Sequence, residues 1–199
     1  FKEIKSKVTI KTKAIVIVHY QGFCVNYLLE LKKFCEKKNI ILVEDAAQAI
    51  GTKFKNKYLG TIGDLACFSF HHTKNIQSGI GGCLVINNKK FIKKSIFAHD
   101  KGSDRTLQVK KIVKWYSWVS LGSSFLMSEL HASYLYPQIK YYNKVIKKRK
   151  IVYKEYLKSL DFKNDNFFLV KNNTCKEYNY HGLVLVLKKN NYEKFINYL

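Results

Sequence analysis

The sequence predicts an α/β fold, in which helices alternate with the strands of a largely parallel sheet. Two short apolar runs, residues 14–19 and 40–43, have the length and the β-branched composition of buried strands. The segment between them places Leu28, Leu31 and Phe34 on one helical face and lysines on the other. A strand, a helix and a strand in this order form a β-α-β unit, which favours parallel pairing.

The elements around this unit follow from composition and turn residues. Residues 1–11 are predicted to be the end of an element, and Asn26 is placed to act as the N-cap of the first full helix. Gly60 and Gly63 predict turns in a connecting stretch, residues 51–64, that includes a short hairpin. The next predicted elements are strands at 65–70 and 83–86, a helix at 88–98, and an irregular polar-aromatic stretch at 101–121.

The rest of the chain is predicted to be more helical and to begin a second domain. A helix starts at Ser128, and Pro137 is expected to kink or restart it, because proline lacks an N–H donor. There follow a basic helix at 140–160, a loop at 161–173, a strand at 183–187 and the start of a helix at 192–199. We expect a large α/β domain at 1–140 and, at 141–199, a linking helix and the beginning of a small α+β domain.

Length and charge limit the classes of protein. With 199 residues and a hydrophobic content of 47%, the chain can form one good-sized domain, or one and part of another. It has no apolar run that spans a bilayer and no signal peptide in its basic first residues, so we expect a cytoplasmic protein without a membrane partner. The net charge of +22 comes almost entirely from lysine, with Arg105 and Arg149 the only arginines. Because base and phosphate recognition favours arginine, a nucleic-acid-binding module ranks behind the functions considered below.

Cysteine and histidine patterns do not indicate a metal site. The five cysteines form no CxxC pair and have no zinc spacing. Cys67 and Cys83 fall inside predicted strands, so buried, reduced thiols are the expectation for the cysteines. His71 and His72 are adjacent at a strand end, where neighbouring side chains are expected to point to opposite faces.

Two strands are each followed by a residue with catalytic potential. The run at 40–43 ends at Glu44 and Asp45, and the run at 65–70 is followed closely by Lys74. Ligands of open α/β sheets bind beyond the carboxyl ends of the strands, so Asp45 and Lys74 are expected at the same end. A lysine that forms a Schiff base and an acid that pairs with the pyridinium nitrogen suit pyridoxal phosphate. By pattern alone, Asp45 can equally be a helix cap or a turn residue.

Five motifs carry a resemblance to a known family. They are DAAQ at 45–48, GTIGD at 60–64, FSFHHTKN at 68–75, KGSDR at 101–105 and WVSLGSSFLMSEL at 118–130. In this order and spacing they resemble the DegT family of nucleotide-sugar aminotransferases, which have the aspartate-aminotransferase-like fold of pyridoxal-phosphate enzymes of fold type I. The last motif resembles the branch of dTDP-4-amino-4,6-dideoxygalactose transaminases. The likeness runs from about residue 12 to about residue 156, and more faintly from 181 to 199.

The resemblance implies roles for five residues. Lys74 corresponds to the lysine that holds pyridoxal 5'-phosphate and then moves a proton between cofactor and substrate. Asp45 corresponds to the acid that pairs with the pyridinium nitrogen, and Gln48 to a residue beside the ring and its phenolic oxygen. Ser69 corresponds to a phosphate ligand, with a strand serine satisfied by backbone as the alternative. Ser124 corresponds to a residue that reaches the phosphate site of a neighbouring subunit.

The resemblance also implies a reaction and partners. Family members move an amino group from L-glutamate to the 4-keto group of a dTDP-4-keto-6-deoxyhexose, for surface polysaccharides, and act as homodimers. Ile80 replaces a common family acid, Asp104 replaces a common asparagine, and His181 matches a family position without a clear role. Family members are much longer, so we expect a chain truncated at both ends. The alternative to an enzyme is a non-catalytic remnant or one half of a split aminotransferase.

Overall fold

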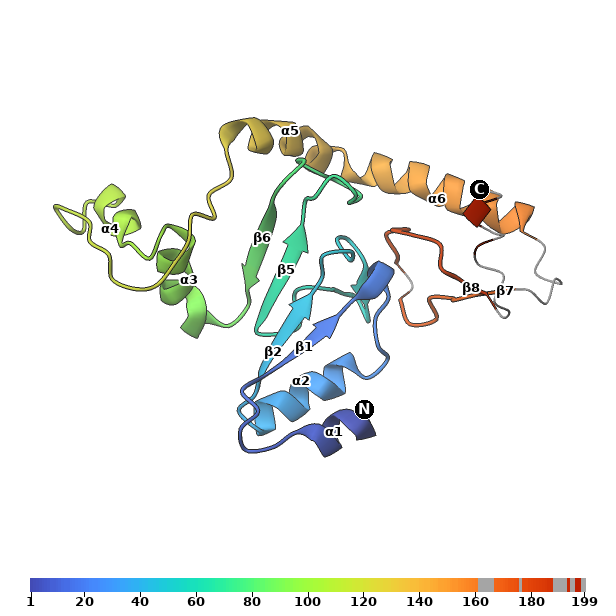
Figure 1. Cartoon of the computed structure of the whole chain (residues 1–199), viewed down its shortest axis with the longest axis horizontal. Coiled ribbons are helices and arrows are strands. Elements are labelled where there is room, and N and C mark those ends of the chain that lie inside the picture. Colours follow the sequence, from blue (N-terminus) through green and yellow to red (C-terminus); the bar gives the residue numbers. More distant parts are fainter. Residues whose placement is uncertain (161–166, 176, 188–192, 194–195, 198–199) are drawn as a thin grey trace.

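A four-stranded sheet in the order β1-β2-β5-β6 forms the centre of the molecule (Figure 1). The fold is that of a computed structural model, which describes residues 1–160, 167–175, 177–187, 193, 196 and 197. The strands β1 (Ala14–Val18), β2 (Ile41–Asp45) and β5 (Leu65–Ser69) run parallel, and β6 (Gly82–Ile86) returns antiparallel to β5. The predicted α/β class and the predicted β-α-β unit are confirmed.

Helix α2 (Leu28–Lys37) covers one face of this sheet, and the short helix α1 (Lys2–Lys7) lies against α2 (Figure 1). Leu28 and Leu31 of α2 are fully buried in the main core, as the helical pattern predicted. The prediction of Asn26 as N-cap is wrong. The N-cap is Tyr27, one residue later, and its side chain makes no capping hydrogen bond; the Val25 carbonyl accepts the Leu28 N–H at 3.4 Å.

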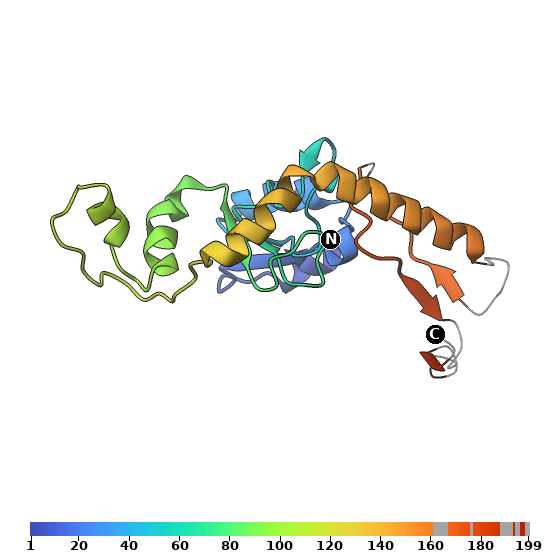
Figure 2. The same cartoon turned by 90° about the horizontal axis from the view of Figure 1, so that it is seen from above.

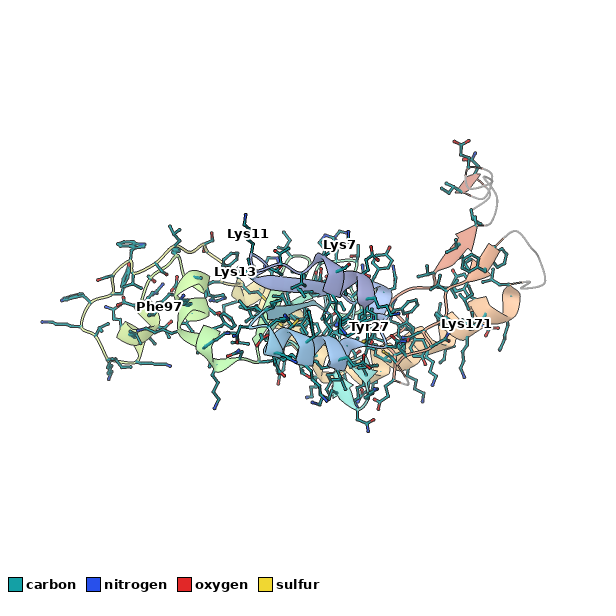
Figure 3. All side chains as sticks on the ribbon, turned by 90° about the horizontal axis from the view of Figure 1, so that it is seen from below. Lys7, Lys11, Lys13, Tyr27, Phe97 and Lys171 are labelled. Atoms are coloured by element: carbon teal, nitrogen blue, oxygen red, sulfur yellow. The ribbon has the colours of Figure 1, made fainter. Side chains whose placement is uncertain are left out.

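Aromatic contacts join α1 to α2. The Phe1 ring stacks on Tyr27, with ring centroids 5.3 Å apart, and meets the edge of Phe34. The lysines around α1 and the turn after it are exposed, and Figure 3 labels Tyr27 and three of them, Lys7, Lys11 and Lys13. Their positive charge is therefore solvated.

The connections around the sheet carry two smaller elements. A 3-10 turn, η1 (Tyr20–Gly22), follows β1. The predicted hairpin is confirmed as β3 (Lys53–Phe54) and β4 (Lys57–Tyr58), with Lys55 and Asn56 both at positive φ in its two-residue turn. Such a turn matches the twist of paired strands.

Residues 100–128 form an extended arm that projects from the sheet (Figures 1 and 2). The arm follows a 3-10 turn, η2 (Lys89–Phe91), and helix α3 (Ile92–His99), as predicted, and contains a short helix, α4 (Arg105–Val109), that was not predicted. At the root of the arm its two ends lie side by side, with the Lys101 N–H donating to the Ser123 carbonyl. Gly102 and Gly122 meet there so closely that a Cβ on either would collide with backbone atoms.

Two consecutive helices, α5 (Glu129–Lys140) and α6 (Tyr142–Ser159), run past the sheet (Figures 1 and 2). Ser128 caps α5, as its position suggested, and the helix is interrupted at Tyr141, shortly after Pro137. Leu135 packs in a second core cluster with Phe70 and Ile76, which follow β5. The start of α6 is anchored by the Tyr142 hydroxyl, which donates to the Ile50 carbonyl at 2.6 Å.

The last part of the chain contains the two-stranded antiparallel sheet of β7 (Phe167–Leu169) and β8 (Leu185–Leu187). β8 confirms a prediction, whereas β7 corrects the expectation of a loop, because its pairing with β8 was not visible from local sequence. The predicted helix at 192–199 lies mostly outside the described residues. Within the described chain, no helix combines the length and hydropathy needed to cross a membrane.

The cysteine predictions are confirmed for three residues and wrong for two. Cys24, Cys35 and Cys175 are buried, whereas Cys67 and Cys83 are exposed. Both exposed thiols lie in strands, as predicted, but Cys67 is on the face that α2 leaves uncovered, and Cys83 is in the edge strand β6, where it pairs with Phe68. A strand position therefore did not ensure burial here.

Candidate functional site

The acidic pair at the end of β2 is divided between the two faces of the sheet. Because strand side chains alternate, Glu44 points into the covered side and Asp45 to the other. β2 includes both Glu44 and Asp45 and so ends two positions later than predicted. The last two residues of β1, Ile17 and Val18, pair with Glu44 and Asp45. The two carboxylates therefore have separate environments.

Glu44 holds together the carboxyl ends of the strands and the loop of the GTIGD motif. Its side chain is fully buried and accepts hydrogen bonds from the N–H groups of Gly60 and Ile62 at 2.8 and 2.7 Å. The Gly63 N–H and the His19 Nε2 complete the set, the latter at 2.9 Å. Burial opposes ionisation of Glu44, but these hydrogen bonds outweigh it and hold its pKa below the usual value.

Asp45 lies on the face that α2 does not cover, which we call the open face. Its neighbours across the sheet are Val18 of β1 and Cys67 of β5. Val16 and Val18 are 61% and 56% exposed, so this face is apolar and accessible. One carboxylate oxygen of Asp45 accepts the Ala47 N–H at 3.0 Å, and within the described residues the other oxygen has no partner.

Lys74 lies in the turn that follows β5, at the same end of the sheet as Asp45. The turn is closed by a hydrogen bond from the Lys74 N–H to the His71 carbonyl at 2.9 Å. The Ser69 hydroxyl, at the end of β5, accepts the His71 N–H at 3.3 Å. The Lys74 side chain is half-buried, and no acceptor in the described part of the chain pairs with its amine. The amine is available to a ligand.

The two histidines before Lys74 do not point to opposite faces, which corrects the prediction. The strand ends at Ser69, so His71 and His72 begin the turn that carries Lys74, and their ring centroids are 3.9 Å apart. The described residues contain no group of three metal-ligating side chains.

His181 approaches Lys74 from the far end of the chain. Its Nδ1 lies 2.9 Å from the Asn75 Oδ1, so the neutral ring donates there. Burial, together with the positive charges of Lys74 and Arg149, lowers the pKa of His181 to about 4. The imidazole of His181 is therefore neutral at neutral pH and is hydrogen-bonded to Asn75, the residue after Lys74.

Asn179 forms hydrogen bonds that hold the segment with His181 against the turn that carries Lys74. Its carbonyl accepts from the Asn75 side chain at 2.7 Å, and its own side-chain amide donates to the Gln48 carbonyl at 2.8 Å. Arg149 of α6 donates to the carbonyls of Tyr180 and His181. Residues 179–181 thereby join the loop after β2 to the turn that carries Lys74.

Gln48 lies in the loop after β2, beside this junction. Its Oε1 accepts the Gln21 N–H at 2.6 Å, which fixes the side chain from the β1 side. The structure thus brings Asp45 and Lys74 to one end of the sheet, as their positions in the sequence predicted, and Gln48 and Ser69 lie at the same end.

Ser124 does not lie near these four residues within one copy of the chain. It is exposed on the arm, where its backbone forms an antiparallel β-bridge with that of Asp100. Two residues depart from the family motifs. Ile80 is 75% exposed, and the Asp104 carboxylate accepts a hydrogen bond from the Ser117 N–H at 2.6 Å within the arm.

Sequence reasoning missed the contacts that position the site. Glu44 was noted only as part of an acidic pair, and alternation along β2 would have separated it from Asp45. Asn179 and Arg149 carry no local signal, because their partners are distant in sequence. Only the resemblance pointed to His181, and it assigned no role.

Comparison with known proteins adds independent information. The whole chain, residues 1–199, matches the DegT/DnrJ/EryC1/StrS aminotransferase family. It is 33% identical over 161 residues to GDP-perosamine synthase of Escherichia coli O157:H7, covering 79% of this chain and 42% of that protein. It is 31% identical over 174 residues to UDP-4-amino-4,6-dideoxy-N-acetyl-beta-L-altrosamine transaminase of Campylobacter jejuni, covering 87% of this chain and 44% of that protein.

Solved structures share the fold. The aminotransferase TlmJ from Streptoalloteichus hindustanus superposes with a TM-score of 0.84 at 19% identity, over 98% of this chain and 52% of that one. Helicobacter pylori PseC, an aminotransferase involved in the biosynthesis of pseudoaminic acid, superposes with a TM-score of 0.82 at 24% identity. The match covers 96% of this chain and 49% of that one. The chain thus spans about half the length of the proteins that it matches.

Proposed function

Since the chain belongs to the DegT/DnrJ/EryC1/StrS aminotransferase family, we propose that it is the cofactor-carrying part of a pyridoxal-phosphate-dependent nucleotide-sugar aminotransferase. The observation that carries this proposal is the placement of Asp45 and Lys74. Asp45 is the last residue of β2, Lys74 follows the neighbouring parallel strand β5, and the Lys74 amine has no competing partner among the described residues. The domain at 1–140 would hold the cofactor, and residues 141–199 would begin the smaller domain.

The residues present suit the cofactor. Pyridoxal phosphate, when bound, supplies an aldehyde for an amine and a ring that accepts electrons. The free carboxylate oxygen of Asp45 would hold a proton on the ring nitrogen, and the amine of Lys74 would bind the aldehyde and later carry a proton. The Ser69 hydroxyl, which accepts from backbone, retains its own hydrogen for a phosphate oxygen. Gln48 would contact the ring from the loop after β2.

The substrate class proposed is a nucleotide-linked 4-keto-6-deoxyhexose, with L-glutamate as amino donor. Support comes from the two curated relatives, whose names specify a GDP-linked and a UDP-linked amino sugar product. The motif at 118–130 favours dTDP as the nucleotide. A comparison of dTDP-, GDP- and UDP-linked ketosugars in one assay would decide among them.

The proposed assembly is a homodimer formed through the arm. Trp118, Leu121 and Phe125 are 71%, 96% and 65% exposed, which is unusual for large apolar side chains. A second copy packed on this arm would bury them and would bring Ser124 to the neighbouring subunit.

A second candidate function is a non-catalytic remnant or one half of a split enzyme. The apolar open face favours it, because parallel sheets are normally covered on both faces. In this form, the chain alone would bind pyridoxal phosphate weakly and turn over negligibly. Activity would appear when the further segments that the longer relatives contain are supplied in cis or as a second polypeptide.

Borohydride trapping tests the proposed function. Reduction of the assembled protein with bound pyridoxal phosphate should fix a pyridoxyl group to the peptide that contains Lys74. The Lys74→Ala variant should lose the label and the visible absorbance of the bound cofactor, whereas Lys101→Ala on the exposed arm should keep both. A label on another lysine in the unaltered protein would contradict the assignment.

A further inference from the structure

A cavity of about 670 Å³ lies between helix α6, the hairpin of β3 and β4, and residues 177–180. Its volume falls within the range of about 300–1,000 Å³ that is typical of small-molecule sites. None of the residues proposed to hold the cofactor in this chain, Asp45, Gln48, Ser69 and Lys74, lines it. The cavity is therefore a second place for a ligand, outside the candidate site.

The inner wall of the cavity is apolar and firmly packed. Leu59 and Ile76 are 0% and 1% exposed, and Phe68 packs against the main core cluster. The Tyr142 ring lies so close to Gly51 that a Cβ on that glycine would collide with it, and its hydroxyl is fixed by the hydrogen bond to the loop after β2. The cavity is thus formed before any ligand enters.

Tyrosine rings make up much of the remaining wall. Tyr58, Tyr142, Tyr178 and Tyr180 all line the cavity. The ring centroids of Tyr178 and Tyr180 are 5.0 Å apart, and Tyr153 of α6 packs against both rings. Aromatic walls favour flat ring systems, which stack on them or meet them edge to face.

The rim of the cavity carries an unbalanced positive charge. The exposed Glu177 carboxylate lies 2.8 Å from the Lys53 Nζ, so its charge is already paired. Lys150 is also exposed at the rim, and none of the ion pairs in the described chain includes it. Its Nζ lies 5.9 Å from the centroid of the Tyr180 ring. A positive charge next to an aromatic wall favours an anionic ligand.

We propose that this cavity binds a small aromatic carboxylate of one or two fused rings. The rings pack between the tyrosines and the apolar inner wall, and the carboxylate pairs with the amine of Lys150. A cationic ring system would meet repulsion at the same amine. The ligand would bridge α6, the hairpin and residues 177–180. The inference does not depend on the proposed function, because it uses none of the residues assigned to the cofactor.

Calorimetric titration of the chain with naphthoate, a two-ring aromatic carboxylate, tests the proposal. We expect a Kd below about 1 mM, which a ligand of this size reaches with ordinary efficiency. The neutral naphthamide has nearly the same shape and should bind about 3- to 5-fold more weakly, because an ion pair at an exposed rim contributes modestly. The absence of naphthoate binding at about 1 mM, or equal binding of the two compounds, would overturn the proposal.

A pair of lysine variants tests the position of the carboxylate. Lys150→Gln should weaken naphthoate binding about 3- to 5-fold and leave naphthamide binding unchanged. Lys148→Gln removes the same charge from an exposed position of α6 outside the cavity and should change neither. Equal weakening in the two variants would show a general charge effect and would overturn the proposal.

A cavity-filling variant tests the position of the rings. Ile146→Trp places a large side chain in the cavity and should abolish the binding of both compounds, with circular dichroism to confirm the fold. Unchanged binding in the folded variant would place the ligand elsewhere and overturn the proposal. If this variant does not fold, the two lysine variants decide, since both of those positions are exposed.

Discussion

Glu44 and Asp45 are consecutive in β2, yet one carboxylate is fully buried beneath the sheet and the other faces its open side. The buried one accepts four hydrogen bonds, and the half-buried one retains an oxygen without a protein partner among the described residues. The first stabilises the fold, and the second is available for chemistry.

Glu44→Gln should lower the free energy of unfolding by about 2–4 kcal/mol, because its amide cannot accept all four hydrogen bonds. Asp45→Asn is the matched control and should change stability by less than about 1 kcal/mol. Urea unfolding at neutral pH measures both. Equal losses in the two variants would contradict the division of roles.

Asp45→Asn should nevertheless abolish most amination activity in the assembled enzyme. The amide has the same size but cannot keep the ring nitrogen of the cofactor protonated. Turnover with each nucleotide-linked ketosugar measures the effect, and circular dichroism confirms the fold. Near-normal turnover in this variant would contradict the proposed role and would show that Asp45 serves only as a turn residue.

Acid should weaken the fold in a window set by His181. Its pKa of about 4 in the folded state lies below the unfolded value of 6.5, so the neutral ring is favoured by folding. The stabilisation is present above pH 6.5 and is lost as pH falls toward 4, where both states become protonated. Since the ring is only half-buried, we expect a loss on the order of 1–2 kcal/mol.

The variants His181→Gln and His99→Gln separate this effect from general acid sensitivity. The first should flatten the dependence of stability between pH 6.5 and 4, and the second, at an exposed position of α3, should not. Glu44 affects folding stability at lower pH than His181 does. Because the pKa of Glu44 is lowered in the folded state, the stabilisation from its ionised form is lost only as the pH falls below the usual carboxylate range. An unchanged slope in His181→Gln would refute the assignment.

Tyr142→Phe should cost about 1 kcal/mol of stability, because it removes the hydrogen bond to the Ile50 carbonyl that anchors α6. The neighbouring Tyr141→Phe is the control, since that ring is 48% exposed and makes no hydrogen bond through its hydroxyl among the described residues. Denaturant midpoints of the two variants provide the comparison. A loss confined to Tyr141→Phe would contradict the structure.

Association through the arm predicts that Leu121→Asp or Trp118→Asp shifts the assembled protein from dimer to monomer. Each places a charge where a second copy would bury an apolar side chain. Ile10→Asp, at an equally exposed position away from the arm, should remain dimeric. Sedimentation measures the three variants, and a dimer that survives both arm substitutions would place the interface elsewhere.

Sequence reasoning located the central strands to within two residues at each end, because buried parallel strands are short apolar runs with clear limits. It also placed Asp45, Ser69 and Lys74 at one end of the sheet, since parallel strands share their carboxyl edge. It could not find the contacts of His181 and Asn179, which depend on the path of the chain across more than half its length. The exposure of Cys67 was equally hidden, because local composition does not reveal which face of a strand is covered.

The glycine contact at the root of the arm separates what can change there from what cannot. Gly102 and Gly122 allow two backbones to touch, so any side chain at either position would force the ends of the arm apart. The tip, around 110–116, is exposed, and there insertions and exchanges meet little resistance. The length and sequence of the tip can therefore change freely, whereas the contact between the two glycines has to be kept for the arm to leave the sheet at this point.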